Sequence, residues 1–239
     1  MVAGLTAVLL LASVVQAMSG FGFALLSMPL LSVIVDTKDA VAVSTLVGTL
    51  ASTVMLARHR RHVCWPLVWP LLGGALAGMP VGLYVLIVLD ERLLRLVLAG
   101  AVLVSVFVLA RGWQLEGRSR RFDLGAGFLS GVLNTSVSTN GPPLVLALQA
   151  RGLEPDAFRA TISALFVAGA VGANLLLAGA GRYTDQVLAY AAVGAPALLV
   201  GGLIGTRLAR RLAVARFRPL VLGLLVVAAM AAGAGALLP

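Results

Sequence analysis

Charged residues are scarce in this 239-residue chain: Asp, Glu, Lys and Arg together make up 11 % of it, whereas an ordinary soluble domain has about 25 %. Apolar residues make up 60 %, and the mean hydropathy is +1.04. So few charges could not cover the surface of a soluble domain of this size. The composition also excludes the disordered, collagen-like, coiled-coil and disulfide-rich classes, which leaves a polytopic membrane protein.

Cysteine and histidine are almost absent. Cys64 is the only cysteine, which excludes an intramolecular disulfide and a cysteine-based metal cluster. The two histidines, His59 and His62, lie together in a basic loop, where solvation is a simpler interpretation than metal binding. No P-loop, metal-ligand spacing or Gly-x-Ser-x-Gly elbow occurs. We therefore expect no enzyme activity, no cofactor and no metal.

Carboxylates are missing from the interior of the apolar runs. All nine acidic residues stand at the ends of these runs. Proton relays and cation pumps generally bury an acid at membrane depth. This placement argues against a cation substrate and against a carboxylate proton relay.

Basic residues are in excess, 18 against 9 acidic ones. In a soluble protein a net charge of +9 would suggest nucleic acid as a partner. Here the basic residues lie in short loops between apolar runs, at 58–61, 111–121 and 207–218. Such clusters are typical of the cytoplasmic loops of membrane proteins. We expect a lipid bilayer, and no nucleic acid, as the partner of these charges.

Charges and chain breakers divide the chain into eight apolar segments, at residues 2–35, 40–57, 64–89, 93–110, 123–149, 157–179, 187–206 and 217–238. A helix of about 20 apolar residues crosses a bilayer, and six of the eight segments fit that length. The runs are continuous rather than alternating, which excludes membrane strands. The predicted fold class is an all-α polytopic integral membrane protein.

Two segments are interrupted by glycine, proline and small polar residues. The first contains residues 19–23 and then Met28-Pro29, and the fifth contains residues 134–143. A continuous helix through Asn140-Gly141-Pro142-Pro143 is disfavoured, because proline removes a backbone donor and clashes with the preceding turn. Freed backbone groups are tolerated at membrane depth only inside protein or beside a wet cavity. Both segments are therefore predicted to be broken or re-entrant helices.

The two halves of the chain also resemble each other. Pro29-Leu30 corresponds to Pro143-Leu144, and Asp39-Ala40 corresponds to Asp156-Ala157. The predicted division is an N-terminal membrane repeat at residues 1–110, a basic cytoplasmic linker at 111–122 and a C-terminal membrane repeat at 123–239.

Equivalent loops of the two halves carry opposite charge bias, which predicts opposite topology. Opposite topology needs an odd number of crossings in each half. Each repeat is then one re-entrant segment plus three transmembrane helices, with both chain ends outside. Loops 58–63, 111–121 and 207–216 would lie in the cytoplasm.

The interruptions are the predicted ligand site. Broken helices place helix N-termini, with partial positive charge and free N–H groups, near the bilayer midplane. Hydroxyls and amides add neutral donors, a combination that suits an oxyanion. The alternative is that these small residues only allow tight helix packing. The candidate substrate-binding residues are Gln16, Ser19, Gly20, Gly22, Ser27, Asn134, Ser136, Ser138, Thr139, Asn140, Gly141, Arg159 and Thr161.

Two further residues carry two interpretations each, and one glycine pattern carries a single one. Arg159 is either an arginine that reaches the membrane interface or an anion contact facing the cavity. Asn174 lies within a segment and either bonds across helices or lines the path. The glycines at 74, 78 and 82 have the spacing of close helix contacts, and we interpret them as packing.

At these residues the chain resembles the sulfite exporter TauE/SafE family, also called the four-toluene-sulfonate uptake permease superfamily. The resemblance covers nearly the full length. It rests on Ser19-Gly20-Phe21-Gly22-Phe23 with Pro29-Leu30, on Gly131 with residues 140–144, and on residues 156–161. It implies a multi-pass transporter of the bacterial inner membrane for small sulfur-containing anions such as sulfite or organosulfonates.

The resulting hypothesis is an anion transporter, with export as the expected direction, that works by alternating access around a midplane site. Two other hypotheses stay open: an anion channel of the same fold, and a membrane scaffold subunit that transports nothing. A homo-oligomer is compatible with the sequence.

Overall fold

The computed structural model describes residues 1–111, 119–211 and 214–237, and every regular element in these ranges is helical. The elements are α1 (Val2–Ser19), α2 (Phe23–Ile34), α3 (Thr37–His59), the short 3-10 turn η1 (Arg60–His62), α4 (Trp65–Val88), α5 (Glu91–Arg111), α6 (Arg120–Val137), α7 (Gly141–Gln149), α8 (Pro155–Gly179), α9 (Asp185–Arg211) and α10 (Val214–Leu237). The predicted all-α class is confirmed.

Both interruptions predicted from the sequence are present as breaks between helices. Gly20 and Gly22 separate α1 from α2 with φ angles of 90° and 97°, which favour glycine. Ser138, with φ 55°, is the one non-glycine residue at positive φ among the described residues, and it ends α6. One expectation is wrong: Met28-Pro29 interrupts nothing, because α2 continues through Pro29.

Five helical stretches of the described residues are long and apolar enough to cross a membrane, namely α1, α3 with η1, α4, α8 and α9. The short α2 and a 13-residue part of α10 are apolar as well. The sequence suggested six segments of spanning length. Four of these six are confirmed as α3, α4, α8 and α9, and α1 is the first part of the interrupted first segment, whose more than 30 apolar residues are divided between α1 and α2.

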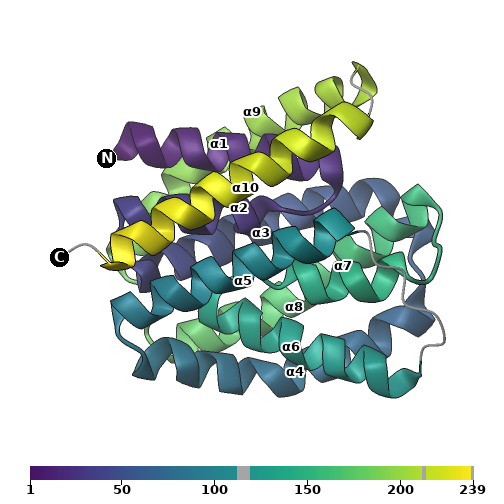
Figure 1. The fold of residues 1–239 in the computed structure, drawn as a ribbon, viewed down its shortest axis with the longest axis horizontal. Helices are drawn as coiled ribbons and strands as arrows, with labels where there is room; N and C mark the ends of the chain where they lie inside the picture. The colour runs from purple at the N-terminus through teal and green to yellow at the C-terminus, as the bar shows by residue number, and fades with distance from the viewer. Residues whose placement is uncertain (112–118, 212–213, 238–239) are drawn as a thin grey trace.

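The helices pair across the two halves of the chain. α4 packs along α6, α1 along α9, α3 along α8 and α5 along α10. In Figure 1 the α4–α6 pair forms one edge of the molecule, and α1 with α9 forms the opposite edge. α1 begins and α10 ends at the same end of the molecule.

Glycines let α4 and α6 approach closely. A Cβ atom added to Gly74, Gly78 or Gly82 of α4 would overlap a backbone carbonyl of α6, and Gly127 and Gly131 of α6 face α4 in the same way. This confirms that the spacing at 74, 78 and 82 serves packing. The contact continues to the last turn of α6, just before the α6–α7 break, where Thr135 donates to the carbonyl of Met79 at 2.6 Å.

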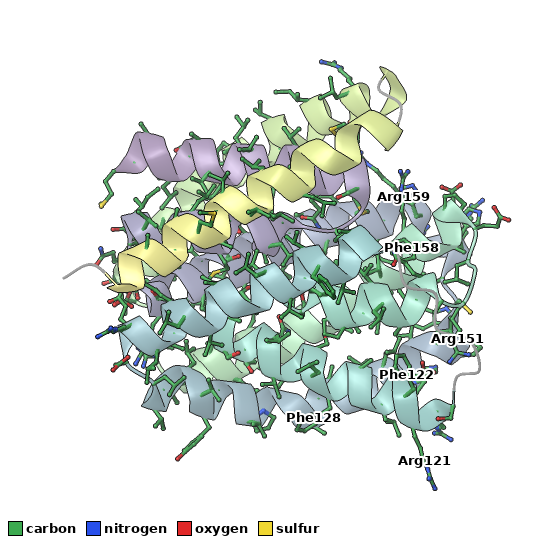
Figure 2. The ribbon with its side chains drawn as sticks, in the orientation of Figure 1. Arg121, Phe122, Phe128, Arg151, Phe158 and Arg159 are labelled. Carbon is green, nitrogen blue, oxygen red and sulfur yellow. The ribbon has the colours of Figure 1, made fainter. Side chains whose placement is uncertain are left out.

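Arginines gather at one end of the bundle. Arg121, Arg151 and Arg159 all lie at the end opposite to the start of α1 (Figure 2). Arg151 donates to Asp123, at 2.5 Å, and Asp123 is 4 % exposed. This ion pair joins the start of α6 to the loop after α7, and so closes the α6–α7 hairpin at its open end.

Candidate functional site

The two helix breaks meet at a small inner cavity of about 50 Å³. We call it the central cavity. It is lined by residues from the α1–α2 break, from the middle of α3, from the α6–α7 break and from α8: Gln16, Gly22, Phe23, Ala24, Leu25, Ser44, Thr45, Gly48, Thr49, Ser52, Asn134, Ser138, Thr139, Asn140, Gly141, Phe166 and Ala170. Segments more than 110 residues apart in the sequence thus share one cavity.

Seven of the predicted site residues line the central cavity: Gln16, Gly22, Asn134, Ser138, Thr139, Asn140 and Gly141. They come from both breaks. The cavity is therefore the place where the two interrupted segments meet, and a role of these residues in binding stays a prediction.

The other six predicted residues lie outside the lining. Ser19 bonds to the carbonyl oxygens of Val15 and Phe21, and so shapes the α1–α2 break beside Gly20. Ser27 lies behind the lining of the central cavity, and its hydroxyl is 3.0 Å from the hydroxyl of Ser44, which is in the lining.

Ser136 donates to the carbonyl of Val132 within its own helix. The Thr161 hydroxyl accepts from the backbone N–H of Cys64, at the start of α4. Arg159 lines a different cavity, described below.

α3 contributes to the lining, which was not predicted from the sequence. Ser44, Gly48 and Ser52 recur at intervals of four, and Thr45 and Thr49 follow the same spacing, so all five lie on one side of the helix and face the cavity. That spacing was visible in the sequence. It stands out less than the breaks do, because α3 is continuous through Gly48 and contains no proline.

Most polar groups of the lining have partners within the protein. Ser138 and Thr45 lie 3.1 Å apart, and the Asn134 amide donates to the carbonyl of Gly169 at 3.2 Å. These bonds join α6 to α3 and to α8. They hold the α6–α7 break rigidly between the helices that surround it.

Two buried polar atoms at the central cavity have no hydrogen-bond partner in the described structure. One is the Thr139 hydroxyl oxygen, on a residue that is 1 % exposed. The other is Oε1 of Gln16, whose Nε2 donates to Ser52 at 3.2 Å. Leaving a buried polar group unpaired costs about 1–3 kcal/mol, so both atoms mark a place where a polar ligand or water would be favourable.

The electrostatics of the central cavity come from helix ends rather than from charged side chains. α2 begins at Phe23 and α7 begins at Gly141, and both starting residues are in the lining. Helix N-termini carry partial positive charge. No acidic or basic side chain is among the described residues of the lining. The arrangement favours a small anion.

A larger cavity of about 900 Å³ lies between α1, α3 and α9. We call it the basic vestibule, because Arg58, His59, Arg159 and Arg207 are in its lining. Gln16 lines the vestibule as well as the central cavity. The two spaces are therefore adjacent, with the Gln16 side chain at their boundary.

A chain of hydrogen bonds leads from the central cavity to the loop between α8 and α9. The Asn174 amide donates to Thr49 of the lining at 2.9 Å, and the Tyr183 hydroxyl donates to Asn174. Burial raises the pKa of Tyr183, which keeps its hydroxyl protonated as a donor. Asn174 thus bonds across helices, one of the two roles considered for it.

Long apolar helices around a buried, uncharged polar cavity define a multi-pass membrane protein with an internal polar cavity. Comparison with known proteins agrees. The family model described as "Sulfite exporter TauE/SafE" matches residues 5–232. The chain belongs to this family, and is a membrane transporter of the bacterial inner membrane rather than an enzyme.

Two curated proteins are similar to the chain. "Probable sulfite/organosulfonate exporter TauE" of Cupriavidus necator is 26 % identical over 232 residues, which cover 93 % of this chain and 90 % of the relative. "Probable inner membrane transporter protein TsaS" of Comamonas testosteroni is 28 % identical over 163 residues, covering 64 % and 65 %. No solved structure matches the chain.

Proposed function

We propose that the protein transports a small sulfur-containing oxyanion, sulfite or an organosulfonate, and that the anion binds in the central cavity. The observation that carries the proposal is the unpartnered Thr139 hydroxyl, buried where two helix N-termini meet. The substrate class and export as the direction follow the name of the Cupriavidus necator relative.

The chemistry of the lining suits such an anion. Hydroxyl and amide donors bind a sulfur oxyanion without the cost of burying a charged partner. One water occupies roughly 10–15 Å³ of such a cavity, so about 50 Å³ admits a group the size of a few waters. Sulfite, or the sulfonate head of a larger molecule, is of that size.

Alternating access between two inverted repeats, residues 1–110 and 123–239, is the proposed mechanism. Helix pairing supports it. Suppose that α1 corresponds to α6, α4 to α9, α3 to α8 and α5 to α10. The symmetry that relates the two repeats then turns the α1–α9 pair into the α4–α6 pair, and it leaves the α3–α8 and α5–α10 pairs unchanged. Rocking of one repeat against the other would then expose the central cavity to each side in turn.

The test is flux in proteoliposomes, with sulfite, sulfoacetate, taurine and thiosulfate as substrates, with and without a pH gradient. Asn140→Leu should abolish transport without loss of expression, because it replaces a cavity amide with an apolar side chain. Undiminished flux of every anion in this variant would contradict the proposal. Large single-channel currents would instead indicate a channel, and no flux together with a co-purifying partner would indicate a scaffold.

A further inference from the structure

The basic vestibule carries cations that the fold does not use. Arg58 and Arg207 are exposed and Arg159 is half-buried, and all three are in its lining. Within the described ranges, no ion pair joins any of them to a carboxylate, and no acidic residue lines the vestibule. Three guanidinium groups that have no carboxylate partner among the described residues surround one cavity, and they create a positive potential that attracts small anions.

The vestibule also leads to the central cavity. Gln16 is 3 % exposed and lines both spaces, and its Oε1 atom has no partner among the described residues. A single bond to Ser52 holds the amide in place, so rotation of one side chain would connect the two cavities. The neighbouring wall is fixed, because Ser13 donates to the carbonyl of Leu198 at 2.7 Å and ties α1 to α9.

We propose that the basic vestibule is the access path of the substrate anion. Arg58, Arg159 and Arg207 make the path selective for anions, and Gln16 is the partition before the central cavity. The vestibule has a volume of about 900 Å³ and the central cavity one of about 50 Å³, and this difference indicates which part of a larger substrate each of them would hold. The sulfonate head of an organosulfonate fits the central cavity, and its organic tail would extend past Gln16 into the vestibule. This inference rests on the proposed function.

The arginine-rich end of the bundle fixes the side from which the path opens. α3 and α9 carry Arg58 and Arg207 near their last turns, and Arg159 lies at the same end of the molecule (Figure 2). By the positive-inside rule this end is cytoplasmic. An exported anion would therefore enter through the vestibule.

The first experiment measures access with charged thiol reagents. The full chain, with Cys64→Ser, receives a cysteine at Leu199, which lines the vestibule, or at the adjacent Val200, which does not. The two side chains are 58 % and 48 % exposed, so the pair is matched. An anionic methanethiosulfonate added to the cytoplasmic face should modify Leu199→Cys and lower sulfite transport at least tenfold. Val200→Cys should stay unmodified and active. Thr206→Cys, also in the lining, is a second probe should Leu199→Cys fail to fold.

The second experiment tests the charge. Adding Arg58→Gln and Arg207→Gln to Leu199→Cys should lower the ratio of anionic to cationic reagent rates about tenfold, and added salt should lower the parent's ratio as well. An unchanged ratio would overturn the role of the arginines.

The remaining outcomes separate this inference from the proposed function. If Leu199→Cys reacts only in detergent, lipid fills the vestibule and the access path is refuted. If modified Leu199→Cys transports normally while Asn140→Leu does not, the central site stands and the path is wrong. If Asn140→Leu transports normally while modified Leu199→Cys is blocked, the path stands and the central site is wrong.

Discussion

At the scale of single residues, Thr139 offers the sharpest test of the binding site. Thr139→Val keeps the shape of the side chain and removes only the hydroxyl, which has no partner in the described structure. A hydrogen bond to a charged ligand is worth about 1.5–3 kcal/mol. We expect the half-saturating sulfite concentration to rise about 10- to 100-fold. The melting temperature of the substrate-free protein should not fall, because no internal hydrogen bond is lost.

Ser136→Ala is the matched control for this prediction. Its hydroxyl bonds only to Val132 and does not line the central cavity, so the variant should transport sulfite with the parent's affinity. Equal effects of the two variants, or a large loss of stability in Thr139→Val, would show that the hydroxyl is structural.

The residues of the site were only partly predictable. Gln16 and residues 134–141 were found because glycine, proline and amides interrupt apolar runs, an effect that is local in sequence. Ser44 and Thr49 were missed because their role depends on which face of α3 meets the breaks, a tertiary property. Arg159 lies in the larger cavity rather than the central one, a separation that spacing along the chain does not encode.

At the scale of helices, the α4–α6 contact depends on glycine at specific positions. A Cβ at Gly78 would overlap the carbonyl of Phe128, whereas a Cβ at Gly73 would meet nothing within 4 Å. Gly78→Ala must push the helices apart, and overpacking typically costs about 1–3 kcal/mol. We expect a clearly lower melting temperature in detergent for Gly78→Ala.

Gly73→Ala on the same helix is the control, and it should be neutral or slightly stabilising because alanine has the higher helix propensity. Equal melting temperatures for both variants would refute direct backbone contact between α4 and α6.

The hydrogen-bond chain from α3 to the loop after α8 gives a second prediction for the elements. Tyr183→Phe removes the donor to Asn174 and leaves that amide, which is bonded to Thr49, with an unpaired oxygen. We expect a loss of about 1–3 kcal/mol, seen as a lower melting temperature. Tyr84→Phe is the control, because that side chain is 67 % exposed. No difference between the two variants would show that the bond from Tyr183 to Asn174 does not stabilise the fold.

At the scale of the whole molecule, the sequence predicted the class of the protein but not how its halves combine. Hydropathy and loop charge are sums over many residues, so they survive errors at single positions. The pairing of α1 with α9 and of α4 with α6 joins helices that are separated by more than 30 residues of the chain. The glycines at 201 and 205 lie close to the backbone of α1. Their spacing in the sequence is compatible with a close helix contact, but it does not indicate which helix makes that contact.

The inverted arrangement predicts opposite exposure for two corresponding loops. In a Cys64→Ser background, Asp36→Cys probes the loop between α2 and α3, and Glu154→Cys probes the loop between α7 and α8; both side chains are exposed. If each half begins with a re-entrant hairpin followed by three crossings, an impermeant thiol reagent should reach Asp36→Cys from outside and Glu154→Cys from the cytoplasm. Proteoliposomes sorted by orientation, or right-side-out and inside-out vesicles, distinguish the faces.

Parallel repeats would place both cysteines on one face, so labelling from the same side would refute the inverted arrangement whatever the substrate is. The position of the loops favours opposite faces: α3 runs from Asp36 toward the end that carries Arg159, whereas α8 begins at that end (Figure 2). Two corresponding helices that enter the bundle from opposite ends would let one rocking motion close the path on one side as it opens the other. Opposite labelling therefore supports alternating access, because it establishes the symmetry on which that motion depends.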